Sequence, residues 1–236
     1  MLRIPGIFRH AKEYCGNGCT ILAGTGSNST RYAMELSRTA EECGADGLLV
    51  VSPYYNKATP EGLYAHYRAI AAAVNIPVIL YNVPSRTGVD IPVSVYAKLA
   101  EIPNIAGVKE ASTDITKVSR ILAACPDSFA VWSGNDDMTV PVISLGGAGV
   151  ISVTSNVFPE QVQAMVHTAL SGDFRSARKA QLDLIPLTDL LFCEVNPIPV
   201  KAAMKMLGYD CGNCRLPLTP LLPENEKKLN ALLSVT

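Results

Sequence analysis

The stretch IAGVKEAS, residues 105–112, joins a short apolar run to a lysine and a glutamate. Residues 105–108 predict a buried strand, and Lys109 and Glu110 stand directly at its end. An ammonium group in this place needs a physical reason, because burial disfavours the charged form of an amine. The reason has to come from the fold in which this strand takes part.

Apolar, β-rich runs of the same kind occur five more times along the chain. Their starts are roughly 20–30 residues apart, which is the length of a strand followed by a helix. The runs are continuous rather than alternating, as is typical of parallel strands covered by helices. They occupy residues 19–25, 47–53, 78–83, 129–134 and 149–154.

The segments between these runs predict helices. Gly44 predicts the end of one helix, while Thr59 as N-cap and Pro60 at the first helical position predict the start of the next. After the sixth run, four helical patterns follow without a linker. We therefore expect one structural domain of class α/β, with six strand–helix units in residues 1–160 and a packed helical region in residues 161–236.

Composition excludes several classes of protein. Hydrophobic residues make up 48% of the 236 residues and charged residues 17%, so a sizeable core is expected. The net charge is −1 and the 20 basic residues form no block, which argues against nucleic acid or a membrane surface as partner. No apolar run approaches the ~20 residues of a membrane span, and the first residues lack a secretory pattern. We expect a cytoplasmic protein.

The seven cysteines are expected to be reduced thiols. Cys15 and Cys19 form one close pair, and Cys211 and Cys214 form another. Four thiolates suit zinc, and CGNC can serve as a redox motif, but the spacings are unmatched and no thioredoxin-like context surrounds the motif. Ordinary loop cysteines are the preferred interpretation, and no metal is expected.

Side chains that could take part in catalysis or substrate binding follow several of the predicted strands. In parallel α/β folds the carboxyl ends of the strands form the site face, so we expect these groups to converge. They are Tyr54, Tyr55, Tyr81, Arg86, Lys109, Gly134, Asp136 and Asp137.

Lys109 is the group with the clearest chemical interpretation. A partly desolvated amine loses its proton more easily and can form a Schiff base with a ketone. Tyr81 is suited to exchange protons beside it, and the planar guanidinium of Arg86 is suited to a carboxylate. Together they predict carbon–carbon bond formation or cleavage on a keto acid, without a cofactor.

Each of these residues also has a purely structural interpretation. Lys109 can pair with Glu110 or another nearby acid, and Tyr81 can be a packed strand aromatic. Arg86 can be an ordinary loop cation. Tyr54 and Tyr55 can be surface or interface aromatics, and Asp136 and Asp137 can simply begin a helix. Their shared position at strand ends favours the chemical interpretation.

Four motifs, in this order and spacing, resemble the dihydrodipicolinate synthase (4-hydroxy-tetrahydrodipicolinate synthase) family. They are LYNVPSRTG, GVKEAS, GVISVTSNV and NPIPVK. The resemblance implies a TIM-barrel-derived fold, condensation of pyruvate with aspartate semialdehyde, and a homo-oligomer, either a dimer or a tetramer. Relatives that cleave N-acetylneuraminate usually lack the SRTG arginine, so the match favours the synthase over that alternative.

The resemblance assigns roles to individual positions. Lys109 matches the Schiff-base lysine and Tyr81 matches the proton donor and acceptor. Tyr55 matches a tyrosine that reaches across a dimer interface. Substrate contacts are expected from Arg86 to the aldehyde's carboxylate, from the main chain of Ile151 to pyruvate, and from Gly134. Asn28 and Tyr54 lie where the family places a lysine-inhibitor cleft.

The chain departs from the family pattern in one respect. The family opens with two further strand–helix units and a GTTGE segment that holds the pyruvate carboxylate, and no GTTGE occurs here. We therefore expect an incomplete eight-unit barrel whose edges are closed by residues 1–18, by another subunit, or by both. Loss of the anchor predicts turnover weaker by ~10²–10³-fold. An inactive, self-associating remnant is the second hypothesis.

Overall fold

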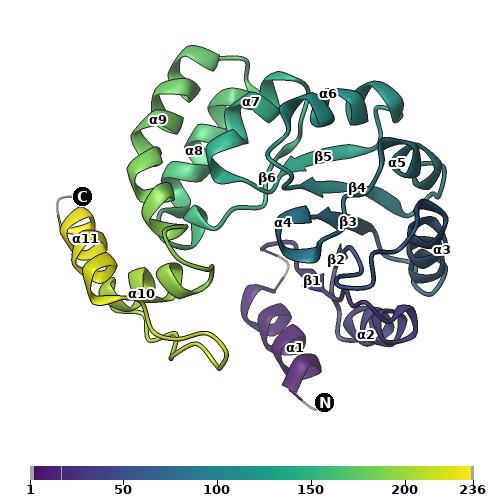
Figure 1. Cartoon of the computed structure of the whole chain (residues 1–236), viewed down its shortest axis with the longest axis horizontal. Coiled ribbons are helices and arrows are strands. Elements are labelled where there is room, and N and C mark those ends of the chain that lie inside the picture. Colours follow the sequence, from purple (N-terminus) through teal and green to yellow (C-terminus); the bar gives the residue numbers. More distant parts are fainter. Residues whose placement is uncertain (1–2, 17, 235–236) are drawn as a thin grey trace. The chain divides into compact units, whose positions relative to one another are not determined.

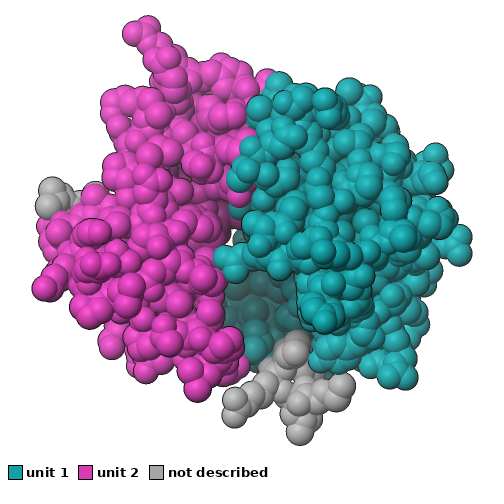
Figure 2. Space-filling model, viewed as in Figure 1, with its two compact units in different colours: residues 1–134, 145–148 teal, residues 135–144, 149–236 magenta. Residues whose placement is uncertain are grey.

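The computed structural model divides the chain into two compact units, coloured separately in Figure 2. The first holds residues 1–134 and 145–148, and the second holds residues 135–144 and 149–236. The predicted division after residue 160 is a different partition and stays a prediction. The structure describes residues 3–16 and 18–234.

All six predicted apolar runs contain a strand, in sheet order β1-β2-β3-β4-β5-β6. The four pairings from β1 to β5 are parallel. An α/β fold with a parallel sheet is thus confirmed, while its assignment to six units of an eight-unit barrel stays a prediction. The strands are β1 (Leu22–Gly24), β2 (Gly47–Val51), β3 (Val78–Asn82), β4 (Ile105–Glu110), β5 (Ala130–Ser133) and β6 (Gly149–Val150).

Helices follow the strands of the first unit as predicted (Figure 1). The Thr59 side chain accepts a hydrogen bond from Gly62 N at 3.2 Å and Pro60 begins the helix, which confirms the predicted N-cap. Gly44 follows its helix at φ +86°, a conformation that favours glycine. The helices are α1 (Arg3–Cys15), α2 (Thr30–Glu42), α3 (Pro60–Ala71), α4 (Pro84–Thr87), α5 (Val93–Leu99) and α6 (Ile115–Ala124).

The two faces of the sheet differ in burial. On the face toward the helices, Leu48, Val50, Leu80, Val108 and Val131 are fully buried. Because successive strand residues face opposite sides, the residues between them form the other face. There Ile79 is buried, but most other side chains are only half-buried, and they include Val51, Tyr81, Lys109 and Trp132.

An ion pair connects α1 with the start of β2. The Asp46 carboxylate accepts hydrogen bonds from Lys12 Nζ and from Ile21 N, both at 2.8 Å. The bond from Lys12 is the main cause of a lowered pKa of Asp46. Residues 1–18 were predicted to close the sheet edge. In the part of that segment that the structure describes, α1 contacts α2. Closure of the sheet edge, by these residues or by another subunit, stays a prediction.

The second unit consists mainly of helices, as predicted for the end of the chain. One cluster of buried apolar residues joins α7, α8 and α9, and another joins α9, α10 and α11. Besides the short 3₁₀ turns 136–138 and 154–156, the helices are α7 (Thr139–Ser144), α8 (Pro159–Leu170), α9 (Phe174–Leu191), α10 (Ile198–Met206) and α11 (Pro223–Leu233).

His66 on α3 is expected to make the stability of the fold dependent on pH. Its Nδ1 lies 2.8 Å from Thr30 Oγ1, and its Nε2 is buried with no partner among the described residues. Burial lowers the pKa of His66 to about 4, below the unfolded value of ~6.5, so the unfolded chain takes up this proton first. The free energy of unfolding is therefore expected to fall by up to about 3 kcal/mol as the pH drops from 6.5 to 4.

Urea unfolding at a series of pH values measures this effect. The variant His66→Gln lacks the titrating group, so the part of the pH dependence that belongs to His66 is expected to disappear. Equal pH slopes for the wild type and the variant would show that His66 does not cause the effect.

Candidate active site

Lys109 lies between two aromatic residues on the half-buried face of the sheet. The strand register places it opposite Tyr81 of β3 and opposite Trp132 of β5. In-register residues of parallel strands face the same side, so the three side chains form one row. The Lys109 Nζ atom lies 4.4 Å from the centroid of the Tyr81 ring. The predicted lysine and phenol are thus brought together.

Gly134 provides the space that the Lys109 side chain occupies. Its N–H donates to Glu110 O at 2.7 Å, which continues the strand pairing beyond β5. A Cβ atom at this position would lie 3.1 Å from Lys109 Cε and only 2.6 Å from Ala111 Cβ. The absence of a side chain at residue 134 therefore lets the lysine stem pass.

We predict that Gly134→Ala slows imine formation at Lys109. The added methyl group pushes on both Lys109 and Ala111, and a displacement of ~1 Å can cost ~10²-fold in rate. Overpacking is also expected to lower the free energy of unfolding by ~1–3 kcal/mol. The measurement is the rate of borohydride trapping with pyruvate.

Gly24→Ala is the matched control for this substitution, because a Cβ there meets nothing within 4 Å. The control is expected to keep the wild-type trapping rate. If Gly134→Ala were trapped as fast as the wild type, the proposed crowding at Lys109 would be wrong.

Burial is the main influence on the Tyr81 hydroxyl. It raises the pKa of Tyr81 above the ordinary tyrosine value, and the positive charge of Arg86 partly offsets this. The phenol therefore stays protonated at neutral pH and is available as a proton donor.

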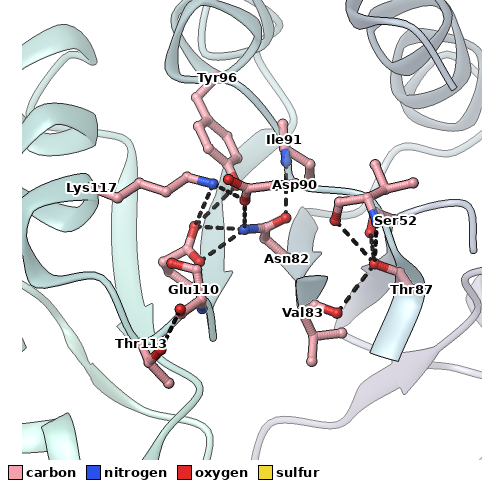
Figure 3. A network of polar contacts seen from close by, with 12 residues as sticks. Ser52, Asn82, Val83, Thr87, Asp90, Ile91, Tyr96, Glu110, Thr113 and Lys117 are labelled. Carbon is pink, nitrogen blue, oxygen red and sulfur yellow. Dashed lines mark hydrogen bonds and ion pairs between the residues drawn. The ribbon is translucent and has the colours of Figure 1, made fainter. Parts of the chain in front are cut away.

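The segment after β3 holds Arg86 in a short, well-bonded turn. Arg86 is exposed and belongs to α4, while its neighbour Thr87 is buried. Thr87 Oγ1 lies 3.2 Å from Val83 O and 3.3 Å from Ser52 Oγ, as Figure 3 shows. Gly88 then leaves the turn at φ +69°. These contacts hold the main chain of the turn from which the Arg86 side chain extends.

The segment after β2 carries the two adjacent tyrosines. Tyr55 is 87% exposed and has a φ of +73°, which is uncommon for a residue with a side chain. Its N–H donates to Thr87 O at 3.1 Å, so this segment is joined to the Arg86 turn. The Asn56 side chain in turn donates to Asn28 O at 3.1 Å. Three of the predicted positions, Asn28, Tyr55 and Arg86, thus lie on connected segments after β1, β2 and β3.

Ile151 belongs to the second unit, where Asp136 organises the segment that follows it. The buried Asp136 carboxylate accepts hydrogen bonds from the Ser152 hydroxyl, from Val153 N at 3.0 Å and from Thr154 N at 3.3 Å. Asp136 and Asp137 begin a 3₁₀ turn, in agreement with the structural interpretation of the two aspartates. The contact of Ile151 with pyruvate stays a prediction.

The structure assigns Glu110 a role other than pairing with Lys109. Glu110 faces the helices, where Lys117 Nζ lies 3.8 Å from its carboxylate. Glu110 was considered from the sequence only as a possible partner of Lys109, and neither its partner Asn82 nor Trp132 was predicted to take part in the site. Trp132 could have been found from the alternation of strand residues, because it stands two positions before Gly134 and so shares its face.

The described residues were also compared with the requirements of a metal site and of a membrane span. Within residues 3–16 and 18–234, no group of three or more His, Cys, Asp or Glu side chains is placed to hold a metal ion. Across the same residues, no helix has both the length and the apolar character needed to cross a membrane.

A comparison with models of protein families shows to which family this chain belongs. A model of the Dihydrodipicolinate synthetase family matches residues 5–236. The chain belongs to this family. The expected resemblance is thereby confirmed, and with it the TIM-barrel-like character of the fold.

Individual members of the family are similar over most of this chain. The 4-hydroxy-tetrahydrodipicolinate synthase of Acetivibrio thermocellus is 48% identical over 96% of this chain and 77% of its own length. The solved dihydrodipicolinate synthase of Aquifex aeolicus has a TM-score of 0.97 at 45% identity and covers 99% of this chain and 80% of its own. The chloride-inhibited enzyme of Acinetobacter baumannii, complexed with pyruvate, has a TM-score of 0.95 at 43% identity, over 98% and 80%.

Proposed function

We propose that this chain is a Schiff-base-forming lyase that condenses pyruvate with L-aspartate 4-semialdehyde, as a 4-hydroxy-tetrahydrodipicolinate synthase. The observation that carries the proposal is the placement of the Lys109 amine 4.4 Å from the centre of the Tyr81 ring on a half-buried face. The names of the relatives support it, since they are 4-hydroxy-tetrahydrodipicolinate synthases and one solved member was complexed with pyruvate.

The first chemical step joins pyruvate to Lys109. The neutral amine attacks the keto carbon, a carbon–nitrogen bond forms, and the keto oxygen leaves as water. The positive iminium withdraws electrons, so the adjacent methyl group loses a proton. This converts the iminium into a neutral enamine. The enamine carbon then bonds to the aldehyde carbon of the second substrate, and the aldehyde oxygen takes up a proton. Attack on the imine carbon by the amino group of the semialdehyde, or by water, breaks the bond to Lys109 and releases its amine. A protonated phenol beside the amine is suited to supply and take back the protons of these steps.

Further roles are proposed for the segments around this pair. Arg86 is suited to the carboxylate of the semialdehyde because its fork binds two oxygens at once. The exposed Tyr55 is proposed to reach the site of a second copy in a dimer or tetramer. The main chain of Ile151 and the space at Gly134 are proposed to receive pyruvate, and Asn28 and Tyr54 to border an inhibitor cleft.

Arg86→Lys is predicted to raise the KM for aspartate semialdehyde by about 10–10²-fold. A lysine keeps the charge but loses the planar fork, and hydrogen bonds to charged groups contribute ~1.5–3 kcal/mol. The pyruvate adduct at Lys109 is expected to form at an unchanged rate, because this step precedes entry of the aldehyde. Steady-state kinetics with each substrate varied in turn provides the measurement, and an unchanged KM for the aldehyde would contradict the role.

Borohydride reduction in the presence of pyruvate, followed by peptide mass mapping, tests the proposed function. An adduct on Lys109 is expected. A coupled assay with aspartate semialdehyde then tests full turnover, and N-acetylneuraminate serves as the comparison substrate for the related aldolase. Absence of an adduct at any pyruvate concentration would overturn the proposal.

A further inference from the structure

A cluster of polar side chains lies on the helix side of the sheet and includes Asn82, Tyr96 and Glu110 (Figure 3). Asn82 follows Tyr81 in β3, and Glu110 follows Lys109 in β4. The strand register pairs Asn82 with Glu110 just as it pairs Tyr81 with Lys109. Because successive strand residues face opposite sides, the two pairs lie back to back across the sheet.

Asn82 links the two strands and the segment that returns after Arg86. Its Nδ2 lies 2.9 and 3.1 Å from the two Glu110 carboxylate oxygens and 2.8 Å from Asp90 Oδ1. Its Oδ1 accepts from Ile91 N at 3.1 Å. The residue is completely buried, and both ends of its amide group are used. Rotation of this side chain would leave its own buried amide group and the buried Ile91 N–H without these hydrogen bonds.

Glu110 connects β4 with two helices and with its own following turn. Its carboxylate accepts from Tyr96 Oη at 3.2 Å and from Ser112 N at 2.8 Å. Burial, and then the Glu110 charge, raise the pKa of Tyr96 well above its ordinary value, so this hydroxyl stays protonated and donates. The ammonium of Lys117 lies 3.8 Å from Glu110 and also bonds to Asp90. It thereby compensates part of the negative charge of the cluster.

We propose that Asn82 and Glu110 are positioning residues, which hold Tyr81 and Lys109 in register from behind the sheet. Each stands one peptide away from the residue that it positions. A satisfied buried network resists reorientation, because any broken bond leaves a desolvated polar group unpaired. The importance of this positioning for catalysis rests on the proposed function. The positioning of the Lys109 side chain itself does not, and it can be tested without substrate.

The bond to Ser112 N extends this control to the backbone just beyond Lys109. Residues 109–112 are thereby held at both ends, by the β3–β4 pairing and by the Glu110 carboxylate. The bond from Ile91 N holds the end of the segment that carries Arg86 in a similar way. One buried cluster therefore controls three of the residues proposed to act on substrate.

The test uses the full chain with the substitution Asn82→Ala. This change removes the side-chain link between Asn82 and Glu110, while the backbone pairing of β3 with β4 and every charge stay in place. The rate of borohydride trapping with pyruvate is expected to fall about 10–10²-fold, in line with a displacement of ~1 Å at a reacting group. The control Leu63→Ala lies in the core at α3, outside the cluster. It is expected to lower the unfolding midpoint but to keep the wild-type trapping rate.

A second measurement does not depend on pyruvate. The acylation rate of Lys109 by acetic anhydride, followed by peptide mass mapping over a range of pH, reports the surroundings of the amine. Its pH profile is expected to move by at least about half a pH unit in Asn82→Ala, a threefold change in the ionisation constant. Leu63→Ala is expected to leave the profile unchanged.

Two results separate this proposal from the proposed function. If the wild type forms no pyruvate adduct, the proposed function fails. The positioning of Lys109 is then tested only by comparing the acylation profiles of the wild type and Asn82→Ala. If Asn82→Ala does not fold, Glu110→Gln takes its place, because it keeps the size of the side chain and removes one acceptor. Wild-type trapping and acylation in a folded variant would overturn the positioning role.

Discussion

Lys109→Arg is expected to lower kcat by about 10⁴-fold or more and to abolish the borohydride adduct. Imine formation needs a neutral primary amine, whereas a guanidinium stays protonated in proteins and has no amine nitrogen free to condense. Loss of a covalent nucleophile elsewhere costs ~10⁶-fold in kcat, so a loss of 10⁴-fold is a conservative expectation. The measurements are the coupled assay with both substrates and mass mapping after reduction with pyruvate.

The geometry explains why the loss of activity is not expected to come from unfolding. Lys109 is half-buried, and its charged end lies over the Tyr81 ring, a position that a guanidinium can also occupy. Lys98→Arg on α5, where the side chain is 61% exposed, is the matched control and is expected to behave as the wild type. An Lys109→Arg enzyme that retained more than about 1% of the activity would contradict a Schiff base at this residue.

Tyr81→Phe is expected to lower kcat by about 10²–10⁴-fold, the usual contribution of a positioned proton donor and acceptor. The phenyl ring keeps its place beside the ammonium, so only the hydroxyl is lost. Adduct formation with pyruvate is expected to slow as well, because release of water from the intermediate needs a proton. Rapid-quench trapping and steady-state kinetics measure the two effects separately.

The pKa of Tyr81 gives this prediction a pH dependence with a definite sign. Since burial raises this pKa above the ordinary value of 10, the hydroxyl is protonated throughout the neutral range. In the wild type, loss of rate that depends on Tyr81 is therefore expected only at pH above ~10, where the phenol begins to ionise. Tyr64→Phe on α3 is the control variant. A kcat for Tyr81→Phe within threefold of the wild type would exclude the proton-transfer role.

Local patterns predicted most of the secondary structure correctly. The apolar runs located all six strands, and the Thr59–Pro60 pair located the start of α3, because capping depends only on residues a few positions apart. Strand lengths were less accurate. The last run was predicted over residues 149–154, but β6 comprises only Gly149–Val150, since the Asp136 carboxylate binds the following main-chain N–H groups instead of a neighbouring strand.

The sequence also located the principal chemical groups. Lys109 and Tyr81 were both predicted at strand ends, and the register places them opposite each other. Gly134 and Trp132 show what remained hidden. The need for glycine at residue 134 follows from Ala111 and from the Lys109 stem, both more than 20 residues earlier in the chain. Trp132 stands beside Lys109 only because β5 pairs with β4.

The sequence by itself determined the alternation of strands and helices, the order of the motifs, and the presence of an amine and a phenol at neighbouring strand ends. These features follow from composition and from contacts within a few residues. Only the tertiary structure decided which residues surround each of the two: Tyr81 and Trp132 flank Lys109 on one face of the sheet, and Asn82, Tyr96 and Lys117 surround Glu110 on the other. Such neighbours are set by strand register and helix packing, which bring together residues that are far apart along the chain.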